Sequence, residues 1–431
     1  MDNVSKFIEF LHSSTNAYEA CASLKKMLLN EGYIELNEYN KWNIEKGKNY
    51  FTTRNNSSII AFQIPTNLSD VSFNISASHT DSPTFKIKPF NDIVVANKYH
   101  MLNTEVYGGP IYSSFFDRAL SISGRMFVKD NNKIREVSVN FDRDLLVIPN
   151  ECIHFNRAVN DGKSYNPQID LLPLLGSNKT LVDLIEKDYC VKKEDILSFD
   201  LTLYSRFRGS KFGAEKEYFM APQIDDLESD YGCFKGFIQA NPNKSINICV
   251  AFDNEEVGSE TKQGAESTFL SDTITRLSKS LNLTDEDIKI ALSKSLMVSC
   301  DNAHAVHPND LAKTDSLNKV FMNEGIVIKH NANQHYATDG SSDAIFKYIL
   351  DKAKVSHQDF TNRSDVRGGG TLGAISTTQV SIKTVDIGLA QLAMHSCVET
   401  AGCKDLDYLI SGMEAFYNSH ITIIDNDIVV E

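Results

Sequence analysis

The sequence contains no long apolar run and no excess of positive charge. None of its uninterrupted apolar stretches approaches the roughly 20 residues that a membrane-spanning helix needs, although 42% of the 431 residues are hydrophobic. The 43 Lys and Arg side chains are outnumbered by 57 Asp and Glu side chains, which gives a formal net charge of −14. Such a charge repels phosphate backbones and anionic lipid surfaces. We therefore expect no nucleic-acid partner and no membrane partner.

Cysteine pairs and a leader peptide are also missing. The eight cysteines form no C-x-x-C pair, and this spacing argues against zinc bound by thiolates. The opening residues, MDNVSKFIEFL, carry two acidic side chains among the first nine and are typical of neither a signal peptide nor a transit peptide. We therefore expect reduced, mostly buried thiols and a cytoplasmic location.

The chain is too long for one ordinary core and suggests two domains. It has no tandem repeat and no low-complexity tail. Residues 1–89 and 215–431 are expected to form one α/β domain. Residues 90–214, in which strand-like pieces at 145–149 and 196–204 alternate with polar loops, are expected to form an inserted β-rich domain.

Several strands are predicted in the α/β domain. Residues 51–65 predict two strands around an Asn-Asn-Ser-Ser turn. Residues 71–78 alternate between apolar and polar side chains, which is the period of a strand. The unbroken apolar runs Ile246–Phe252 and Leu296–Cys300 are typical of strands covered on both faces.

Helices are predicted at both ends of this domain. Two apolar stripes indicate helices within residues 1–30, and residues 339–354 and 392–416 read as further helices. The alternation of strands with helices predicts a layered α/β fold with a substantially parallel core sheet.

Metal-binding residue types follow several of the predicted strands. Sites in open α/β sheets form in the crevice outside the carboxyl ends of the strands, so these side chains are expected at one edge of the sheet. The candidates are His79, Glu255, Glu256, Asp301 and His395, the last of which follows a short predicted strand at 385–387 and the start of the next helix. A further segment supplies the paired Asp225 and Asp226 between the two candidate domains.

This set of residues suits a hydrolase with two metal ions. Imidazole and carboxylate together favour zinc or a neighbouring transition metal. Two ions about 3.5–4 Å apart need a bridging carboxylate, and the adjacent Glu255 and Glu256 offer one ligand and one base. Each piece also has a simpler interpretation: a loop histidine, a solvated Glu-Glu pair, or an Asp-Asp pair that caps a helix.

At these residues the sequence resembles the aspartyl aminopeptidase / aminopeptidase I family of dinuclear zinc exopeptidases. The matching stretches occur in the family's order and cover nearly the whole chain. They are SASHTDSP (76–83), YGGPIYSSFFDRAL (107–120), VNDGKSYNPQIDLLPLLG (159–176), IDDLES (224–229), FDNEEVGS (252–259), DNAHAVHPN (301–309), KHNANQHYATDG (329–340), NRSD (362–365), GGGTLG (368–373) and QLAMHS (391–396).

The resemblance implies an aminopeptidase that removes the first residue of peptides and binds two zinc ions per subunit. Cobalt or manganese would accept the same ligands. It also implies that the inserted domain mediates dimerisation and that subunits assemble into a tetrahedral dodecamer. The ligands carried over are His79 and Glu256 on one zinc, Asp301 and His395 on the other, and Asp225 between them.

Other site residues are also implied by the resemblance. Glu255 would be the general base, and Asp81 would orient the ring of His79 from behind. His154 matches a family histidine that either binds zinc or reaches a neighbouring subunit's site; we prefer the second role. A packed histidine beside Phe155 is the alternative.

The resemblance also indicates residues that contact substrate. Lys329 could pair with an acidic first side chain, with Tyr336 beside it. The family includes members that prefer acidic first residues and members that prefer neutral ones. His304 and His307 are expected to line or support the site, or to be structural loop histidines.

Two rival interpretations share these residues. A two-metal carboxypeptidase or amide deacylase would use the same ligands and bind the substrate carboxylate with Arg118, Arg157 or Arg363. A non-catalytic assembly protein on the same fold would be expected to lack ligands or base, whereas all six matched positions hold competent residues. Peptides with blocked amino or carboxyl ends distinguish these functions.

Overall fold

The chain forms two compact units. The computed structural model describes residues 2–242, 244–366, 368–425 and 427–431. Within these, the larger unit takes residues up to 81 together with 209–394 and 399–431, and the smaller unit takes residues 82–208 and 395–398. The domain boundaries predicted at 90 and 214, and the dimerisation role of the inserted domain, stay predictions.

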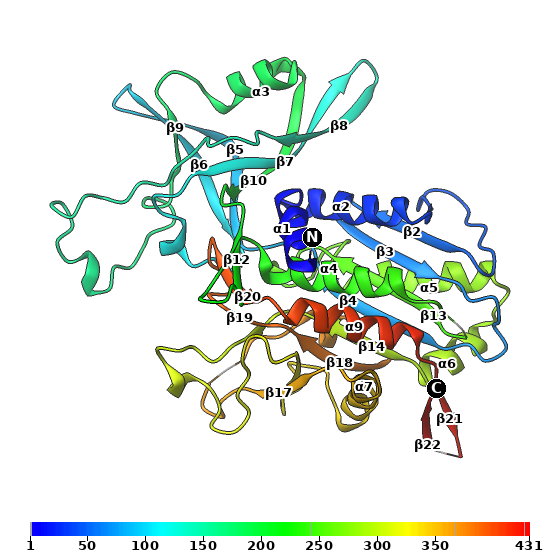
Figure 1. The fold of residues 1–431 in the computed structure, drawn as a ribbon. Helices are drawn as coiled ribbons and strands as arrows, with labels where there is room; N and C mark the ends of the chain where they lie inside the picture. Colours follow the sequence, from blue (N-terminus) through cyan, green and yellow to red (C-terminus); the bar gives the residue numbers. More distant parts are fainter. Residues whose placement is uncertain (1, 243, 367, 426) are drawn as a thin grey trace. The chain divides into compact units, whose positions relative to one another are not determined.

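The larger unit combines a mixed sheet with helices on both faces (Figure 1). Its elements are α1 (Asn3–His12), α2 (Ala17–Asn30), β1 (Ile34–Glu35), β2 (Asn49–Arg54), β3 (Ser58–Gln63), β4 (Phe73–His79), β11 (Ser210–Phe212), β12 (Tyr218–Ala221), α4 (Ile224–Gln239), β13 (Ile246–Phe252), the 3-10 turn η4 (Glu255–Val257), α5 (Phe269–Ser280), α6 (Asp285–Ser293), β14 (Leu296–Cys300), β15 (Ala303–His304), η5 (Leu311–Lys313), β16 (Ile326–His330), α7 (Gly340–Ala353), β17 (His357–Thr361), α8 (Leu372–Ser376), β18 (Lys383–Gly388), β19 (Ala390–Leu392), β20 (Glu399–Gly402), α9 (Asp405–Asn418), β21 (Ile421–Ile424) and β22 (Asp427–Val430).

The nine-stranded sheet has the order β1-β2-β3-β13-β4-β14-β18-β16-β17. Its centre is parallel: β4 pairs in parallel with both β13 and β14, and β14 pairs in parallel with β18. The neighbouring pairs β3–β13 and β16–β18 are antiparallel. The predicted strands at 246–252 and 296–300 are confirmed, and every residue in them is buried.

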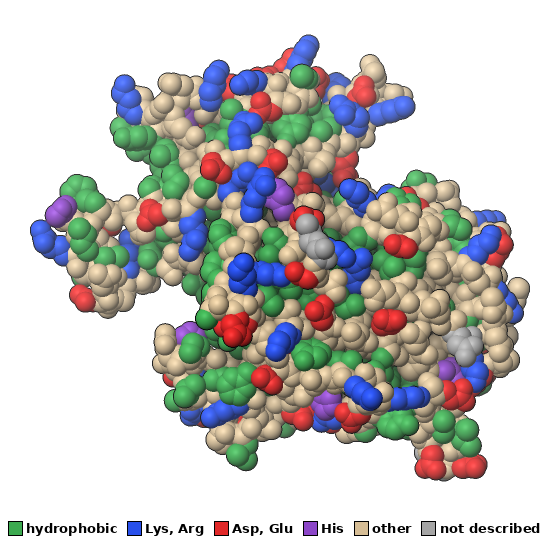
Figure 2. Space-filling view, in the orientation of Figure 1, with side chains coloured by type: hydrophobic (Ala, Val, Ile, Leu, Met, Phe, Trp, Pro, Cys, Tyr) green, Lys and Arg blue, Asp and Glu red, His purple; other side chains and the backbone are tan. Residues whose placement is uncertain are grey.

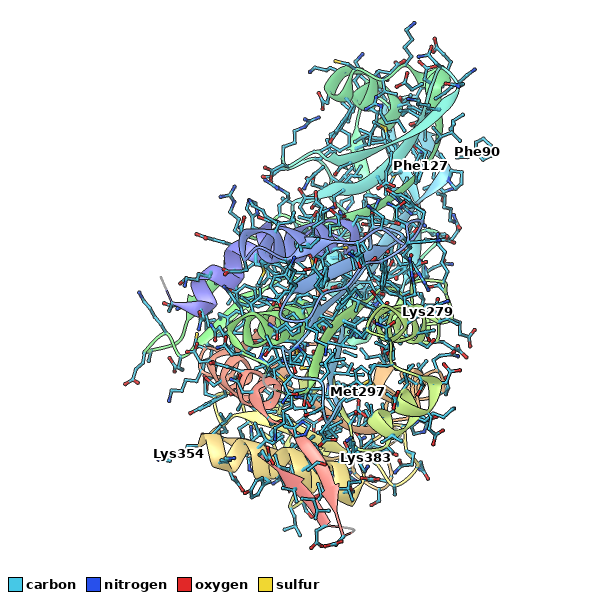
Figure 3. All side chains as sticks on the ribbon, turned by 90° about the vertical axis from the view of Figure 1, so that its right-hand side faces the viewer. Phe90, Phe127, Lys279, Met297, Lys354 and Lys383 are labelled. Atoms are coloured by element: carbon cyan, nitrogen blue, oxygen red, sulfur yellow. The ribbon has the colours of Figure 1, made fainter. Side chains whose placement is uncertain are left out.

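Alternate residues of the central strands enter two separate hydrophobic cores. Cys249 and Ala251 of β13 pack with side chains from α1, α2, α4, α7 and α9. Ile248 and Val250 pack on the other face with side chains from α5 and α6. In Figure 3, Met297 of β14 lies inside the molecule, and it belongs to this second core. Both faces are therefore covered, as the unbroken apolar runs predicted.

The period of two in β4 is present, but its polar face is not exposed. Asn74, Ser76 and Ser78 are all fully buried. The side-chain amide of Asn74 donates to the Ser419 carbonyl at 2.8 Å, and the Ser78 hydroxyl donates to Asp230 Oδ1 at 2.6 Å. These polar side chains tolerate burial because α4 and the end of α9 supply hydrogen-bond partners.

The predicted helix over 392–416 is wrong in its first half. Residues 390–392 and 399–402 form β19 and β20, and the helix α9 begins only at Asp405. Ala393 and His395 have φ angles of 58° and 68°, which a right-handed helix does not allow. The helix predicted over 339–354 is confirmed as α7, and Asp339 caps it through the amides of Ser341 and Ser342.

The smaller unit is rich in strands and has its own apolar core. One six-stranded sheet has the order β8-β7-β10-β5-β6-β9. The piece predicted at 145–149 forms only isolated bridges. The unit's elements are β5 (Thr84–Val95), β6 (Tyr99–Tyr107), η1 (Tyr112–Phe115), β7 (Leu120–Asp130), β8 (Lys133–Asn140), η2 (Val159–Asp161), β9 (Leu174–Gly176), α3 (Leu181–Tyr189), η3 (Lys193–Asp195) and β10 (Ile196–Ser205).

Surface features fit the composition. Among the described residues, no helix is both long and apolar enough to span a bilayer. Acidic and basic side chains are interspersed on the face drawn in Figure 2, so the negative charge is not gathered in one patch there.

Phe90 on β5 is 93% exposed and points away from the ribbon in Figure 3. The eight cysteines, all in the described part of the chain, form no disulfide, and five of them are buried.

Candidate metal centre

Three parallel strands of the larger unit deliver polar side chains to one edge of the sheet. β4 ends at His79, which pairs in register with Phe252 at the end of β13. The short turn η4 after β13 carries Glu255 and Glu256. Asp301 directly follows β14, and its amide donates to the Ile387 carbonyl at 3.0 Å. The arrangement follows from parallel pairing, because parallel strands end at the same edge.

His79 lies at the centre of these carboxylates. Its Nε2 atom is 3.7 Å from Asp225 Oδ1, 4.0 Å from Glu255 Oε2 and 4.0 Å from Asp301 Oδ1. The ring is 1% exposed, and the side chain of Asp225 is 3% exposed. His79, Asp225, Asp226 and Asp301 each offer one ligand atom, and these four atoms lie within 4.8 Å of one another. The same is true of one ligand atom from each of His79, Glu255 and Glu256.

Asp81 connects two of the segments that carry these side chains. Its Oδ1 atom accepts the Glu255 amide at 3.1 Å, and its Oδ2 atom accepts the Glu256 amide at 3.2 Å. The same carboxylate lies 3.3 Å from Nδ1 of His79. The end of β4 and the turn after β13 are thus held by one buried side chain. Contact through Nδ1 leaves Nε2 as the ring atom directed at the carboxylates.

The Asp225–Asp226 pair enters the site at the first turn of α4. Both residues have non-helical backbone angles, and the peptide bond between them is cis. The Asp225 amide donates to Glu399 Oε2 at 3.0 Å. Asp226 Oδ2 accepts the His79 amide at 3.1 Å, and its carboxylate is fully buried. Glu399 contributes to the site although nothing in the sequence marked it, whereas Asp226 was marked by the Asp-Asp doublet but given no separate role.

The charged side chains in this cluster shift one another's pKa values. The pKa of Glu255 is raised to about 8, mainly by burial. His79 opposes this rise, whereas Asp301 and Glu256 add to it. Burial also raises the pKa of Asp226 well above its ordinary value. Burial alone would lower the pKa of His79, but Asp226 and the other carboxylates around it raise the pKa well above the usual value. The site therefore concentrates negative charge that burial makes costly.

Lys329 on β16 is buried rather than exposed. Its side chain is 3% exposed, and Nζ donates to the Asn302 carbonyl at 2.8 Å and lies 3.5 Å from Asp301 Oδ2. Nζ also lies 5.5 Å from the centre of the Tyr336 ring. Burial would lower the pKa of Lys329, but Asp301 and Tyr336 raise it above the usual value. This lysine is consequently charged and is placed against the carboxylate cluster.

Two of the predicted ligands belong to the smaller unit. His395 begins the segment 395–398, and its Nδ1 atom lies 3.1 Å from the Gly109 carbonyl. His154 lies in an irregular stretch and is exposed, as is Phe155 at 86%. A histidine packed beside Phe155 is therefore wrong for this chain. The roles of His154 and His395 stay predictions.

The larger unit's cluster fits a divalent cation. Oδ1 of Asp226 is buried and, among the described residues, has no hydrogen-bond partner. A buried carboxylate oxygen of this kind is costly unless a cation compensates it. Imidazole with carboxylates is a donor set that zinc accepts, and none of the candidate metal groups in the described chain includes a cysteine.

Comparisons with known proteins identify the family of this chain. A family model described as "Aminopeptidase I zinc metalloprotease (M18)" matches residues 10–417. A Clostridium novyi protein described as "Probable M18 family aminopeptidase 2" is 44% identical over 432 residues, which cover 97% of this chain and 100% of the relative.

Solved structures share the fold. One, a cryo-EM structure of the Ape4 and Nbr1 complex, matches with a TM-score of 0.92 and 32% identity over 96% of this chain and 85% of that chain. The structure of the S. cerevisiae mApe1 dodecamer matches with a TM-score of 0.85 and 23% identity over 96% of both chains. The α/β fold expected from the sequence is confirmed. The chain belongs to the aminopeptidase I (M18) family of zinc metalloproteases and is a zinc-dependent metalloaminopeptidase.

Proposed function

We propose that the chain hydrolyses the first peptide bond of its substrates at the carboxylate cluster around His79, with two metal ions and with Glu255 as the general base. The observation that carries this proposal is the set of four carboxylates within 4.0 Å of one imidazole nitrogen, reached from Asp225, Asp226, Glu255 and Asp301. Like charges at such distances are stable together when cations separate them.

The proposed ligands differ in one respect from the set that the resemblance implies. Because His79 Nε2 and Asp301 Oδ1 are 4.0 Å apart, we assign these two residues to the same ion. Asp225 stays the proposed bridge. Glu256 is assigned to the second ion, and His395 remains the further ligand carried over from the family. Bound zinc would polarise the scissile carbonyl and lower the pKa of a water molecule.

Glu255 is proposed to move the proton. Its carboxylate would accept a proton from the attacking water and return it to the departing amine. Its backbone amide is held by Asp81, which limits the carboxylate to positions near Nε2 of His79. The cluster's negative charge would also attract the free α-amine of a peptide, which restricts cleavage to the first residue.

We propose further that Lys329 favours substrates with an acidic first residue. Its buried ammonium group lies 3.5 Å from Asp301 and has the Tyr336 ring beside it. A bound cation would offset the negative charge of Asp301. The ammonium group of Lys329 would then attract a substrate carboxylate more strongly. His304 and His154 are kept as proposed substrate contacts, His154 through a neighbouring subunit.

Assembly is proposed from relatives. One structural neighbour is described as a dodecamer, and we propose that this chain also forms dimers and a tetrahedral dodecamer that encloses its sites. Peptides rather than folded proteins would then be the substrates. A cytoplasmic location remains a proposal drawn from the sequence.

The direct test is Glu255→Gln with Glu260→Gln as the matched control, because Glu260 is an exposed glutamate of the same segment. We expect Glu255→Gln to bind metal normally and to lose roughly 10²–10⁴-fold in kcat on an aminoacyl-anilide, the usual contribution of a general base. The control should keep wild-type kcat. Near-wild-type turnover by Glu255→Gln would show that another group is the base.

A further inference from the structure

A cavity of the larger unit lies close in the chain to Asp301 but contains none of the proposed metal ligands. Its volume is about 310 Å³. Its lining comes from four parts of the chain, within residues 304–307, 313–314, 360–366 with 368–369, and 391–394. The described lining residues include no aspartate and no glutamate, which is unusual in a chain with a net charge of −14.

Two buried amide groups supply donors at this cavity. Oε1 of Gln391 accepts a hydrogen bond from the Asn302 side-chain amide at 2.9 Å. The NH₂ group of Gln391 is therefore not the end that contacts Asn302. Gln391 is 1% exposed, and its Nε2 atom has no hydrogen-bond partner among the described residues. Asn362 is partly exposed, but its Nδ2 atom is also buried and has no hydrogen-bond partner among the described residues. Buried donors without acceptors are costly, so a ligand that supplies acceptors would be stabilised here.

The rim adds positive charge and a further donor. Lys313 lines the cavity and, within the described residues, takes part in no ion pair. Nδ1 of His307 accepts the Asn309 amide at 3.2 Å, so the neutral ring carries its proton on Nε2 and can donate from there. Arg363 contributes less, because its guanidinium group binds both oxygens of Asp365 at 2.8 and 2.6 Å.

The cavity is coupled to the metal cluster by one residue, through its side chain and its backbone carbonyl. Asn302 directly follows Asp301, donates its amide to Gln391 and accepts the Lys329 ammonium group on its carbonyl. A group bound in the cavity would therefore be near the cluster, and of the residues proposed above to contact substrate only His304 lines the cavity.

We propose that this cavity binds a carboxylate of the peptide portion that follows the first residue. The proposal rests on the proposed aminopeptidase function. Donors without acceptors, an unpaired lysine and a lining without acids together match a carboxylate. The carboxylate can come from the C-terminus of a short peptide or from an acidic side chain downstream of the cleaved bond, and both present the same chemistry.

The test compares Leu-Gly-Gly with its C-terminal amide, using the zinc-loaded full-length protein. The ratio of their kcat/KM values should be about tenfold in favour of the free acid, and Lys313→Met should reduce it to about twofold or less. Lys319→Met is the matched control, because Lys319 is an exposed lysine of the same loop that does not line the cavity; its ratio should equal that of the wild type. Gln391→Leu should reduce the ratio as well.

A second pair, Leu-Gly-Glu-amide and Leu-Gly-Gln-amide, distinguishes the sources of the carboxylate. Preference for the Glu peptide that is lost in Lys313→Met assigns the cavity to downstream side chains, and preference only for the free C-terminus assigns it to chain ends; either result supports the site. Equal rates by the wild type within both pairs, or a preference in either pair that is unchanged in Lys313→Met, would overturn it.

Two results separate this proposal from the function on which it rests. If Lys313→Met instead changes the preference between Asp-anilide and Leu-anilide, the cavity takes the first side chain, and our assignment is wrong. If the zinc-loaded wild type cleaves neither Leu-anilide nor Asp-anilide, the proposed function itself fails.

Discussion

The buried Asp230 on α4, beneath the site, should make the free energy of unfolding depend on pH. Its carboxylate is fully buried, and Oδ1 accepts the hydroxyl of Ser78, the residue before His79. Burial raises its pKa from 3.8 to about 8; the Ser78 hydrogen bond and His79 lower it, and Asp81 raises it slightly. Between these two values the folded protein keeps a proton that the unfolded chain loses.

The sign and size of the effect follow from this difference. Stabilisation by the protonated Asp230 is fully present below about pH 4 and is lost as the pH rises through about 8. Each pKa unit is worth about 1.4 kcal/mol, so raising the pH from 5 to 7 should remove about 2–3 kcal/mol of unfolding free energy through this group. Asp230→Asn mimics the protonated form and should not show this loss.

The assay is urea unfolding of the metal-depleted wild type and Asp230→Asn proteins at pH 5 and pH 7. Asp427→Asn, at an exposed position on β22, controls for the loss of one carboxylate. We expect the stability of Asp230→Asn relative to the wild type to rise by about 2–3 kcal/mol between the two pH values. A difference that stays constant across this range would refute the argument that Asp230 is protonated in the folded chain.

Two further predictions concern specificity and helix capping. Lys329→Met should reduce the preference for Asp-anilide over Leu-anilide by about tenfold, the change expected for one lost charged hydrogen bond; unchanged preference, measured as a kcat/KM ratio, would remove Lys329 from substrate recognition. Thr284 forms a capping box with Asp287 at the start of α6, so Thr284→Ala should cost about 1 kcal/mol of unfolding free energy, whereas Ser293→Ala at the exposed end of the same helix should cost much less in the same denaturant titration.

The strands that build the site could be predicted because their signal is local. Unbroken apolar runs and period-two alternation marked β13, β14 and β4, and the metal-ligand residue types directly after them marked the sheet edge. The first half of the helix predicted over 392–416 was wrong because left-handed backbone angles at Ala393 and His395 leave no trace in apolar periodicity, whereas its second half is α9. Tertiary pairing of β20 with β12 and β19 decided that segment instead.

Other site features depend on contacts between distant segments. The carboxylate of Glu399 reaches the Asp225 amide across 174 positions, and no sequence spacing predicts such a bond. The resemblance indicated a substrate contact for Lys329, but only the fold shows that its side chain is buried beside Asp301. The donors of the cavity, Gln391 and Asn362, are neutral amides whose chemistry becomes visible only when their lack of partners is known.

The most direct test of the central claim is a zinc titration of metal-depleted protein, with hydrolysis of Leu-Gly-Gly and of its N-acetylated form followed at each step. The account predicts no hydrolysis without metal and recovery that saturates at two zinc ions per chain. The N-acetylated peptide should stay intact throughout. Full activity without metal, saturation at a single ion, or cleavage of the acetylated peptide at a comparable rate would contradict it.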